Sequence, residues 1–236
     1  MTFEHALWLT AAMMALAFVQ QSLEHLGPAT RLRERLLFAP RLLLSALLLA
    51  SVVLWGIGFV PGVLALMLVV NHLAILPFFN GPYNGGADRM SLLILLCLTG
   101  ALLMPEQRWR EMALGYLAMQ VVLSYAIAGW VKLVNPAWRR GEALRDVFLF
   151  SAYPAGQNIR RWAARPGLLR LMGCAVMGFE LAFPLAMLSR TALMVGLVVA
   201  ALFHLANACL FGLNRFVWIW LCAYPSLLWL QHRMAG

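Results

Sequence analysis

The chain has 236 residues, of which 63% are hydrophobic and 11% are charged, and its mean hydropathy is +0.82. This polar content is too small to cover a soluble globule of that size, so the composition predicts an integral membrane protein. A formal net charge of +9 would suggest a nucleic-acid partner for a soluble protein. Here the arginines cluster between apolar runs, where arginines contact lipid headgroups and set orientation. We therefore expect the lipid bilayer as partner and exclude nucleic acid.

Apolar runs that are long enough to cross a bilayer, about 20 residues each, recur along the chain. The first candidate, from Ala6 to Leu26, is apolar as far as Val19 and then reads QQSLEH. We interpret it as a span with a polar inner end, and the alternative is a shallow interfacial helix. Seven further runs lie at about 41–60, 62–79, 89–104, 111–133, 167–188, 191–213 and 215–231. The expected fold is an all-α bundle of seven or eight transmembrane helices, with residues 1–236 forming a single transmembrane domain and no soluble domain.

The connections between these runs predict an orientation. The loops at 27–41, 80–89, 134–167 and 214–215 hold most of the arginines. On the other side of the expected bundle there are only Arg108, Arg110, Arg190 and Arg233. Basic loops stay in the cytoplasm, so we expect a non-cytoplasmic C-terminus in a bacterial inner membrane. We also expect an interfacial helix around 137–150, with Trp138 at headgroup depth.

Four ionisable residues fall inside expected spans or at their ends, where such residues are costly and often functional. Lys132 is the only lysine in the chain and ends the run 111–133, where a lysine commonly extends to the headgroups. His72 and His204 each stand past the middle of a helix, and a single interhelical hydrogen bond is the simplest alternative for both. Glu180 is nearest the middle of the membrane: buried alone it would tend to stay protonated, and with an arginine or histidine partner it would be ionised.

The glycine-rich segment NGPYNGGADR at 80–89 is expected at the same face as Lys132, His72 and His204. Its glycines permit positive φ and close backbone approach, and Asp88 can cap the helix that follows. Two interpretations stay open: a tight capped connection, or the wall of a ligand site that these three side chains also line. In the second interpretation the ligand-binding residues are His72, Asn84, Gly85, Gly86, Asp88, Arg89, Trp138 and Glu180.

Three stretches of the chain resemble one known family. The segment SYAIAGWVKLVNPAWRRGEAL resembles the A-G-x-x-K-L...W...G segment of the horizontally transferred transmembrane (HTTM) domain, the membrane part of vitamin K-dependent gamma-carboxylases. NGGADRMSLLILLCL resembles the family's N-G-G-D and apolar run, interrupted here by Ala87. The stretch from FELAFPL to AYPSLL resembles its E...P...R...F-H...F...P pattern. Together the three cover about residues 70–228, in the order found in the family.

The resemblance implies candidate catalytic roles for Lys132 and His204. In the carboxylases the matching lysine deprotonates vitamin K hydroquinone, and the family's F-H pair falls on Phe203-His204. The chemistry is physically sensible, because a desolvated amine can give up its proton near neutral pH and a guanidinium cannot. The family's site faces the lumen, whereas the arginine count places Lys132 on the cytoplasmic side. The carboxylases also carry a large soluble region, and we do not predict protein carboxylation.

Two functions stay open at this point. The first is a membrane protein that holds a quinone or another lipid in an intramembrane pocket near the basic face, with redox or proton-transfer chemistry at Lys132. The second is a non-catalytic accessory subunit of a larger membrane complex, in which the same polar residues lock helices together. Haem bound by His72 and His204 is a weaker third option because each histidine stands alone on its helix, and we expect no metal site.

Overall fold

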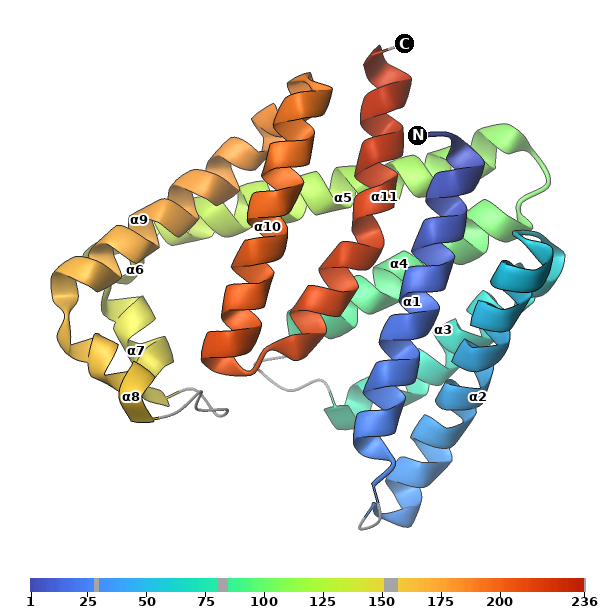
Figure 1. The fold of residues 1–236 in the computed structure, drawn as a ribbon, viewed down its shortest axis with the longest axis horizontal. Helices are drawn as coiled ribbons and strands as arrows, with labels where there is room; N and C mark the ends of the chain where they lie inside the picture. The colour runs from blue at the N-terminus through green and yellow to red at the C-terminus, as the bar shows by residue number, and fades with distance from the viewer. Residues whose placement is uncertain (28–29, 80–84, 151–156, 236) are drawn as a thin grey trace. The chain divides into compact units, whose positions relative to one another are not determined.

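Helices make up nearly all of the computed structural model, which describes residues 1–27, 30–79, 85–150 and 157–235 (Figure 1). Within these residues, seven helices are long and apolar enough to cross a membrane. They are α1 (Phe3–His25), α2 (Leu32–Trp55), α3 (Phe59–Phe79), α4 (Gly85–Leu103), α5 (Gln107–Val134), α9 (Pro166–Ala182) with its 3-10 extension η2 (Phe183–Leu188), and α10 (Arg190–Phe211). The expected all-α membrane protein is confirmed.

Both ends of the chain form long helices. The first apolar run continues through QQSLEH as one 23-residue helix, α1, so it has the length of a full span. The last expected run forms α11 (Asn214–Ala235), a 22-residue helix that is less apolar than the other seven and contains Pro225.

Helix α2 begins at Leu32, well before the expected start at residue 41. The segment LRERLLFAP is charged but helical, and Pro40 is accommodated inside the helix. Arg41 therefore lies within α2, and it is 1% exposed. The expectation that Arg41 belongs to a loop facing the headgroups was wrong. The charged segment before Arg41 is helical, and hydropathy alone does not predict this.

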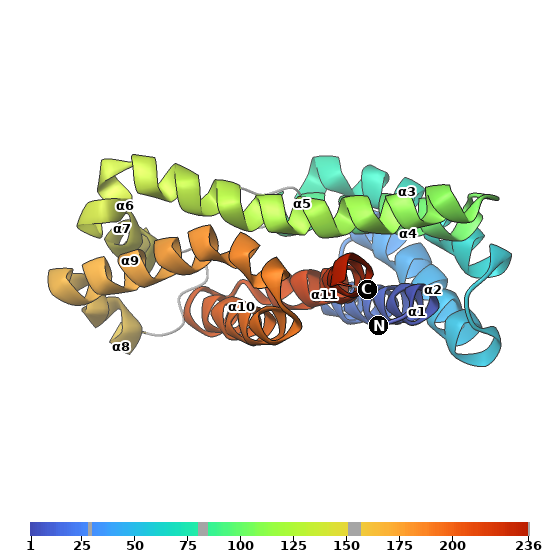
Figure 2. The same ribbon diagram turned by 90° about the horizontal axis from the view of Figure 1, so that it is seen from above.

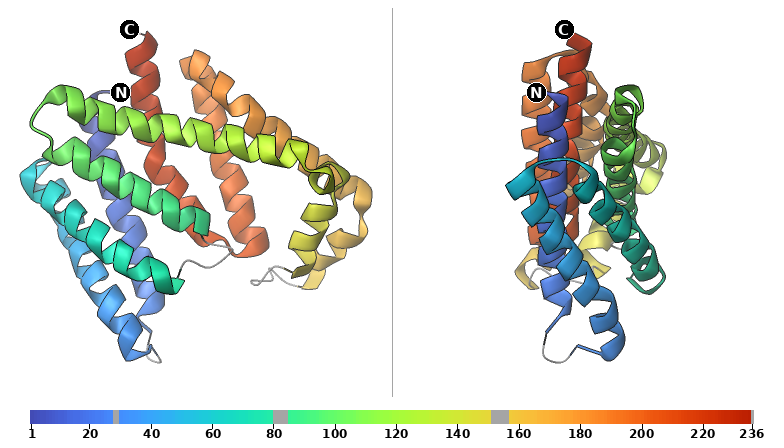
Figure 3. Two further views of the ribbon diagram at one scale, coloured as in Figure 1. Left: turned by 180° about the vertical axis from the view of Figure 1, so that it is seen from behind. Right: turned by 90° about the vertical axis from the view of Figure 1, so that its right-hand side faces the viewer.

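The chain forms two compact units. The first unit contains residues 1–118 and 215–236, and the second contains residues 119–214. Both are built from membrane-spanning helices, and the expected single transmembrane domain stays a prediction. In the first unit α1 packs along α2, and α3 packs against both α2 and α4. The two views of Figure 3 show these neighbours side by side.

Short helices follow α5 in the second unit: α6 (Pro136–Arg140), α7 (Glu142–Phe150), α8 (Gln157–Arg160) and the 3-10 turn η1 (Arg161–Ala164). Figure 2 shows α6 and α7 gathered beside α9. The turn between α6 and α7 is Gly141, with φ of 79°, and a Cβ there would lie 2.9 Å from the backbone nitrogen of Arg170. Leu144 and Phe148 of α7 pack with Phe211 of α10 in a small core. The helix expected around 137–150 is thus two short helices held against α9 and α10.

Candidate functional site

Lys132 forms a buried ion pair in the second unit. Its Nζ donates to both carboxylate oxygens of Glu180, each at 2.7 Å. The Glu180 side chain is 3% exposed and that of Lys132 is 18% exposed. The ammonium also lies 5.3 Å from the ring centroid of Trp138. We call Lys132 and Glu180 the lysine pair. The Lys132 side chain turns toward α9, so the partner of Glu180 is a lysine and not the arginine or histidine that the sequence suggested.

Close contact between α5 and α9 places the two residues of the lysine pair within reach. Gly129 stands one helical turn before Lys132, and a Cβ at Gly129 would lie 2.9 Å from the backbone nitrogen of Leu181 and 3.0 Å from Cβ of Glu180. Only glycine leaves room for this approach, as is common where membrane helices touch.

A second polar contact in this unit joins Tyr125 to His204. The Tyr125 hydroxyl and the His204 Nε2 lie 2.8 Å apart in a buried hydrogen bond. The Tyr125 ring centroid is 4.1 Å from that of Phe183 and 5.8 Å from that of Phe179. Tyr125, Gly129 and Lys132 lie at i, i+4 and i+7, so they share one face of α5.

An apolar groove opens next to this aromatic group, between the α9–η2 segment and α10. Its volume is about 570 Å³, and its lining includes Phe179, Phe183, Ala186, Ala192, Gly196 and Val199. Ligand pockets in proteins commonly have this size and apolar character. The groove lies at the Ser189 end of these helices, which the arginine count places on the non-cytoplasmic side, whereas the sequence predicted a pocket near the basic face.

His72 belongs to a separate group in the first unit. Its Nδ1 accepts a hydrogen bond from Nη2 of Arg41 at 2.9 Å, and its Nε2 donates to the backbone carbonyl of Asp88 at 2.8 Å. A guanidinium has donors only, so the contact with Arg41 fixes His72 as the neutral tautomer with its proton on Nε2. Both ring nitrogens are engaged, as expected of a residue that locks helices together.

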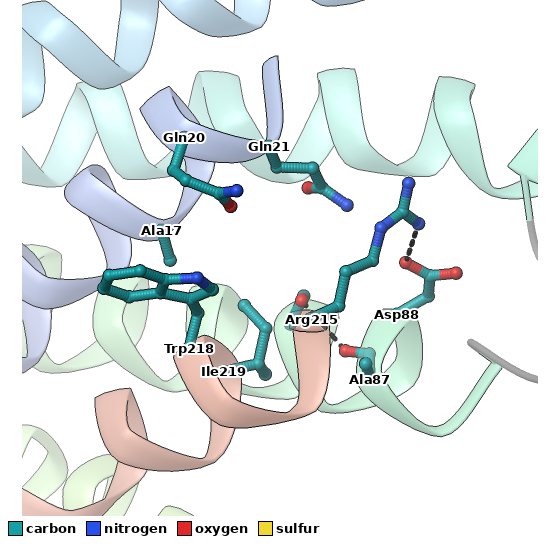
Figure 4. A pocket seen from close by; sticks show the side chains of 9 residues that line it. Ala17, Gln20, Gln21, Ala87, Asp88, Arg215, Trp218 and Ile219 are labelled. Atoms are coloured by element: carbon teal, nitrogen blue, oxygen red, sulfur yellow. Dashed lines mark hydrogen bonds and ion pairs between the residues drawn. The ribbon is translucent and has the colours of Figure 1, made fainter. Parts of the chain in front are cut away.

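The same group continues through Asp88 to α11. Oδ1 of Asp88 accepts from Nη1 of Arg215 at 3.4 Å, and Nη2 of Arg215 donates to Nε2 of His25 at 2.7 Å. Figure 4 shows the Arg215 guanidinium and the Asp88 carboxylate facing each other beside Gln21. We call this set the arginine cluster; its members are His25, Arg41, His72, Asp88 and Arg215.

The residues predicted from the sequence thus divide between the two units. His72 and Asp88 meet in the first unit, and Lys132, Glu180 and Trp138 meet in the second. The prediction that His72, His204 and Lys132 line one cavity stays a prediction. Of the glycine-rich segment, Asn84 lies outside the described residues, Gly85 begins α4, Gly86 packs on Phe216, and Arg89 is exposed.

Sequence reasoning did not identify Arg41, Arg215, His25 or Tyr125 as site residues. The arginines were assigned to headgroup-facing loops by counting charge. A signal for Tyr125 was present, because its i+7 spacing from Lys132 places both on one helix face.

A family model described as the HTTM domain matches residues 100–231, which is more than half of the chain. The matched range contains Tyr125, both residues of the lysine pair, His204 and Arg215. No curated protein and no solved structure matches the chain.

Proposed function

We propose, from the premise that this chain belongs to the HTTM domain family, that its second unit binds a lipophilic ligand and transfers a proton at Lys132. The observation that carries the proposal is the lysine pair, in which the only lysine of the chain contacts one of its two buried carboxylates. Fixed positive charge is provided elsewhere in the chain by seventeen arginines. A lysine is needed where the cation must be able to release its proton.

The lysine pair can exist in two forms that differ by the position of one proton. In the first form an ammonium faces a carboxylate, and in the second the proton has moved to Glu180 and left a neutral amine. The second form carries no charge, which lowers the cost of its burial. The amine can then accept the proton of a ligand hydroxyl, and the ligand oxyanion forms beside the new ammonium.

The ligand class follows from the groove and the aromatic group beside it. Apolar side chains suit an isoprenoid or acyl tail, and a flat aromatic head suits the rings of Phe179 and Phe183. The hydrogen bond between Tyr125 and His204 offers a polar contact for a carbonyl or hydroxyl of the head. A quinone meets all of these requirements, and another lipid with a hydroxyl-bearing head meets most of them.

Ligand binding is tested by mass spectrometry of lipids extracted from protein purified out of native membranes in mild detergent. We expect one quinone or lipid species at a constant ratio to the protein. Gly196→Leu should displace it, because Gly196 lines the groove and already approaches Ala186. Gly178→Leu is the matched control, because nothing lies within 4 Å of a Cβ at that position. Equal ligand content in both variants would contradict the proposed groove.

Proton transfer is tested with a soluble naphthohydroquinone, whose anion is oxidised by dissolved oxygen to the quinone with release of hydrogen peroxide. The wild type should accelerate this oxidation. Lys132→Arg keeps the positive charge but cannot act as a base, so acceleration should fall by about 100-fold or more while the melting temperature is nearly kept.

A second candidate function, an accessory subunit of a larger membrane complex, is favoured by the geometry of the lysine pair itself. Two short contacts to both carboxylate oxygens are also what a lock between α5 and α9 requires. If Lys132→Arg matches the wild type in oxidation rate and stability, this function is the better one. Purification in mild detergent should then yield the chain with its partner proteins.

The proposed location is the bacterial inner membrane, with the C-terminus on the non-cytoplasmic side. The support is the row of exposed arginines between α5 and α9, among them Arg139, Arg140 and Arg145. A C-terminal alkaline phosphatase fusion should be active, and a C-terminal fluorescent protein dark. The opposite pair of results would invert the orientation.

A further inference from the structure

Two ion pairs lie in the first unit where α5 begins and α11 ends. Nη2 of Arg110 lies 3.5 Å from Oε1 of Glu4, and Nη2 of Arg233 lies 3.0 Å from Oε2 of Glu111. Arg108 stands in the first turn of α5, is exposed, and has no ion pair among the described residues. Its guanidinium is therefore available to an anionic ligand.

A groove of about 490 Å³ opens beside Arg108. Its charged lining residues are Arg108, Arg233 and Glu111, so the lining carries one net positive charge. The Glu111 carboxylate is already occupied, because it accepts from Nε2 of Gln107 at 3.0 Å and also pairs with Arg233. Glu106, directly before α5, is exposed and does not line the groove. The uncompensated charge in the groove is therefore that of a guanidinium.

The groove becomes apolar one helical turn further along both helices. Gly115 of α5 and Trp229 of α11 lie there, and a Cβ at Gly115 would lie 3.7 Å from Cζ3 of Trp229. The side chains of Met112 and Leu230 complete this part of the lining. A groove of this volume that is charged at one end and apolar at the other suits an amphiphilic ligand.

The charged end of the groove lies where a membrane helix meets the headgroups. Arg108 is in the first turn of α5, and Arg233 is in the last turn of α11. Trp109, beside Arg108, is 49% exposed, and tryptophan is enriched at headgroup depth. The apolar end then lies at the depth of acyl chains. Guanidinium groups match the geometry of phosphate oxygens particularly well.

We propose that this groove binds one anionic phospholipid, with its phosphate at Arg108 and Arg233 and one acyl chain along Met112 and Leu230. The single net charge of the lining matches the single charge of such a lipid. A zwitterionic lipid would add an ammonium group, and the one carboxylate among the lining residues, that of Glu111, is already occupied. This inference does not depend on the function proposed for the second unit.

The first test maps the lipid on the full-length wild-type protein by photocrosslinking. The protein is reconstituted in phosphatidylcholine vesicles with a trace of phosphatidylglycerol that carries a diazirine on one acyl chain. After illumination, peptide mass spectrometry should find the label at or next to Met112 and Leu230. Excess unlabelled phosphatidylglycerol should suppress this labelling, because it competes for the same groove.

Two controls of this experiment can overturn the proposal. Equal labelling of the same peptides by a diazirine phosphatidylcholine would show that the groove does not select an anionic lipid. Inorganic phosphate is added at constant ionic strength, and it should leave the labelling unchanged because it lacks an acyl chain. Suppression as strong as that by phosphatidylglycerol would assign the site to a free anion and overturn the lipid assignment.

Variants test whether the unpaired guanidinium is the cause. Arg108→Gln breaks no ion pair, so it should keep the melting temperature of the wild type. Half-maximal labelling should then need about fivefold more phosphatidylglycerol, since one arginine near anionic lipid contributes about 1 kcal/mol. Arg190→Gln is the matched control, because Arg190 is exposed at the start of α10 and lines no part of this groove. An Arg108→Gln variant that labels like the wild type, or like an equally weakened Arg190→Gln, contradicts the proposal.

Discussion

Each unit of this protein buries one carboxylate, and the two carboxylates meet different cations. Asp88 in the first unit faces arginine, and Glu180 in the second unit faces the only lysine of the chain. A guanidinium stays charged under all ordinary conditions and only donates hydrogen bonds, whereas a lysine amine can release its proton. The arginine cluster therefore holds fixed charge, and the lysine pair is suited to moving a proton.

The two carboxylates also differ in the size of the space beside them. Arg215 and Asp88 of the arginine cluster border a cavity of about 10 Å³, which holds about one water-sized sphere. The second unit has an apolar groove of about 570 Å³. Phe179, which lines that groove, directly precedes Glu180 in α9. The chemistry that we propose on a lipophilic molecule is therefore placed at the lysine pair, which lies beside the larger of the two spaces.

The largest loss of stability is expected when one residue of the lysine pair is replaced and the other is kept. Lys132→Met leaves the Glu180 carboxylate buried without its cation, which should lower the free energy of unfolding by about 3 kcal/mol. Adding Glu180→Leu should recover most of that loss, because no unpaired charge is then buried. Both are measured by denaturant unfolding in detergent. A double variant that is no more stable than Lys132→Met would show that the pair is not a coupled unit.

A somewhat smaller effect is expected from separating the helices that hold the lysine pair. Gly129→Ala places a methyl group 2.9 Å from the Leu181 nitrogen, and overpacking of this kind costs about 2 kcal/mol. Gly178→Ala in α9 meets open space and should be neutral or slightly stabilising. Similar melting temperatures for both variants would mean that α5 and α9 are not in tight contact at Gly129.

Removing one hydroxyl tests the polar contact next to the groove. Tyr125→Phe keeps the ring packing against Phe183 but removes the hydrogen bond to His204, and should cost about 1 kcal/mol. The free energy of unfolding gives the stability effect, and the oxidation rate of naphthohydroquinone shows whether this contact also matters for the proposed chemistry. A loss above about 3 kcal/mol would instead indicate rearrangement of the aromatic group.

The smallest effect is expected at an exposed ion pair. Nη2 of Arg145 lies 3.3 Å from Oδ1 of Asp146, and both side chains are about half exposed. Arg145→Gln should change the free energy of unfolding by less than about 0.5 kcal/mol, because water screens such pairs. A cost as large as that of Lys132→Met would remove the distinction between buried and exposed pairs on which the comparison depends.

The spans were predictable from the sequence because membrane thickness sets the length of an apolar helix. The start of α2 was not, since the turn around Arg33 and Arg35 is charged yet helical. Hydropathy also treats every arginine alike, so it could not separate buried Arg41 from the exposed arginines between α5 and α9.

The sequence identified the individual residues of the candidate site but not which of them contact each other. Lys132 was identified by the family motif and because it is the only lysine. Glu180 was identified by its own expected depth in the membrane. Lys132 and Glu180 are 48 positions apart in the chain, and their contact depends on how α5 and α9 pack against each other, which a single sequence does not reveal. Gly129 allows the close approach through its missing Cβ; it is the glycine of the A-G-x-x-K-L segment, but the segment does not say which helix packs against it.

The place of Arg41 in the chain bears on how the protein enters the membrane during synthesis. An arginine at the centre of a spanning helix opposes insertion by about 2.5–3.5 kcal/mol. Helix α1 is made before α2 and carries Phe18, whose ring centroid lies 3.5 Å from the Arg41 guanidinium carbon. His72 and Asp88 are translated only later. The first two helices are therefore suited to insert as one hairpin, with the aromatic ring shielding the arginine until its polar partners arrive.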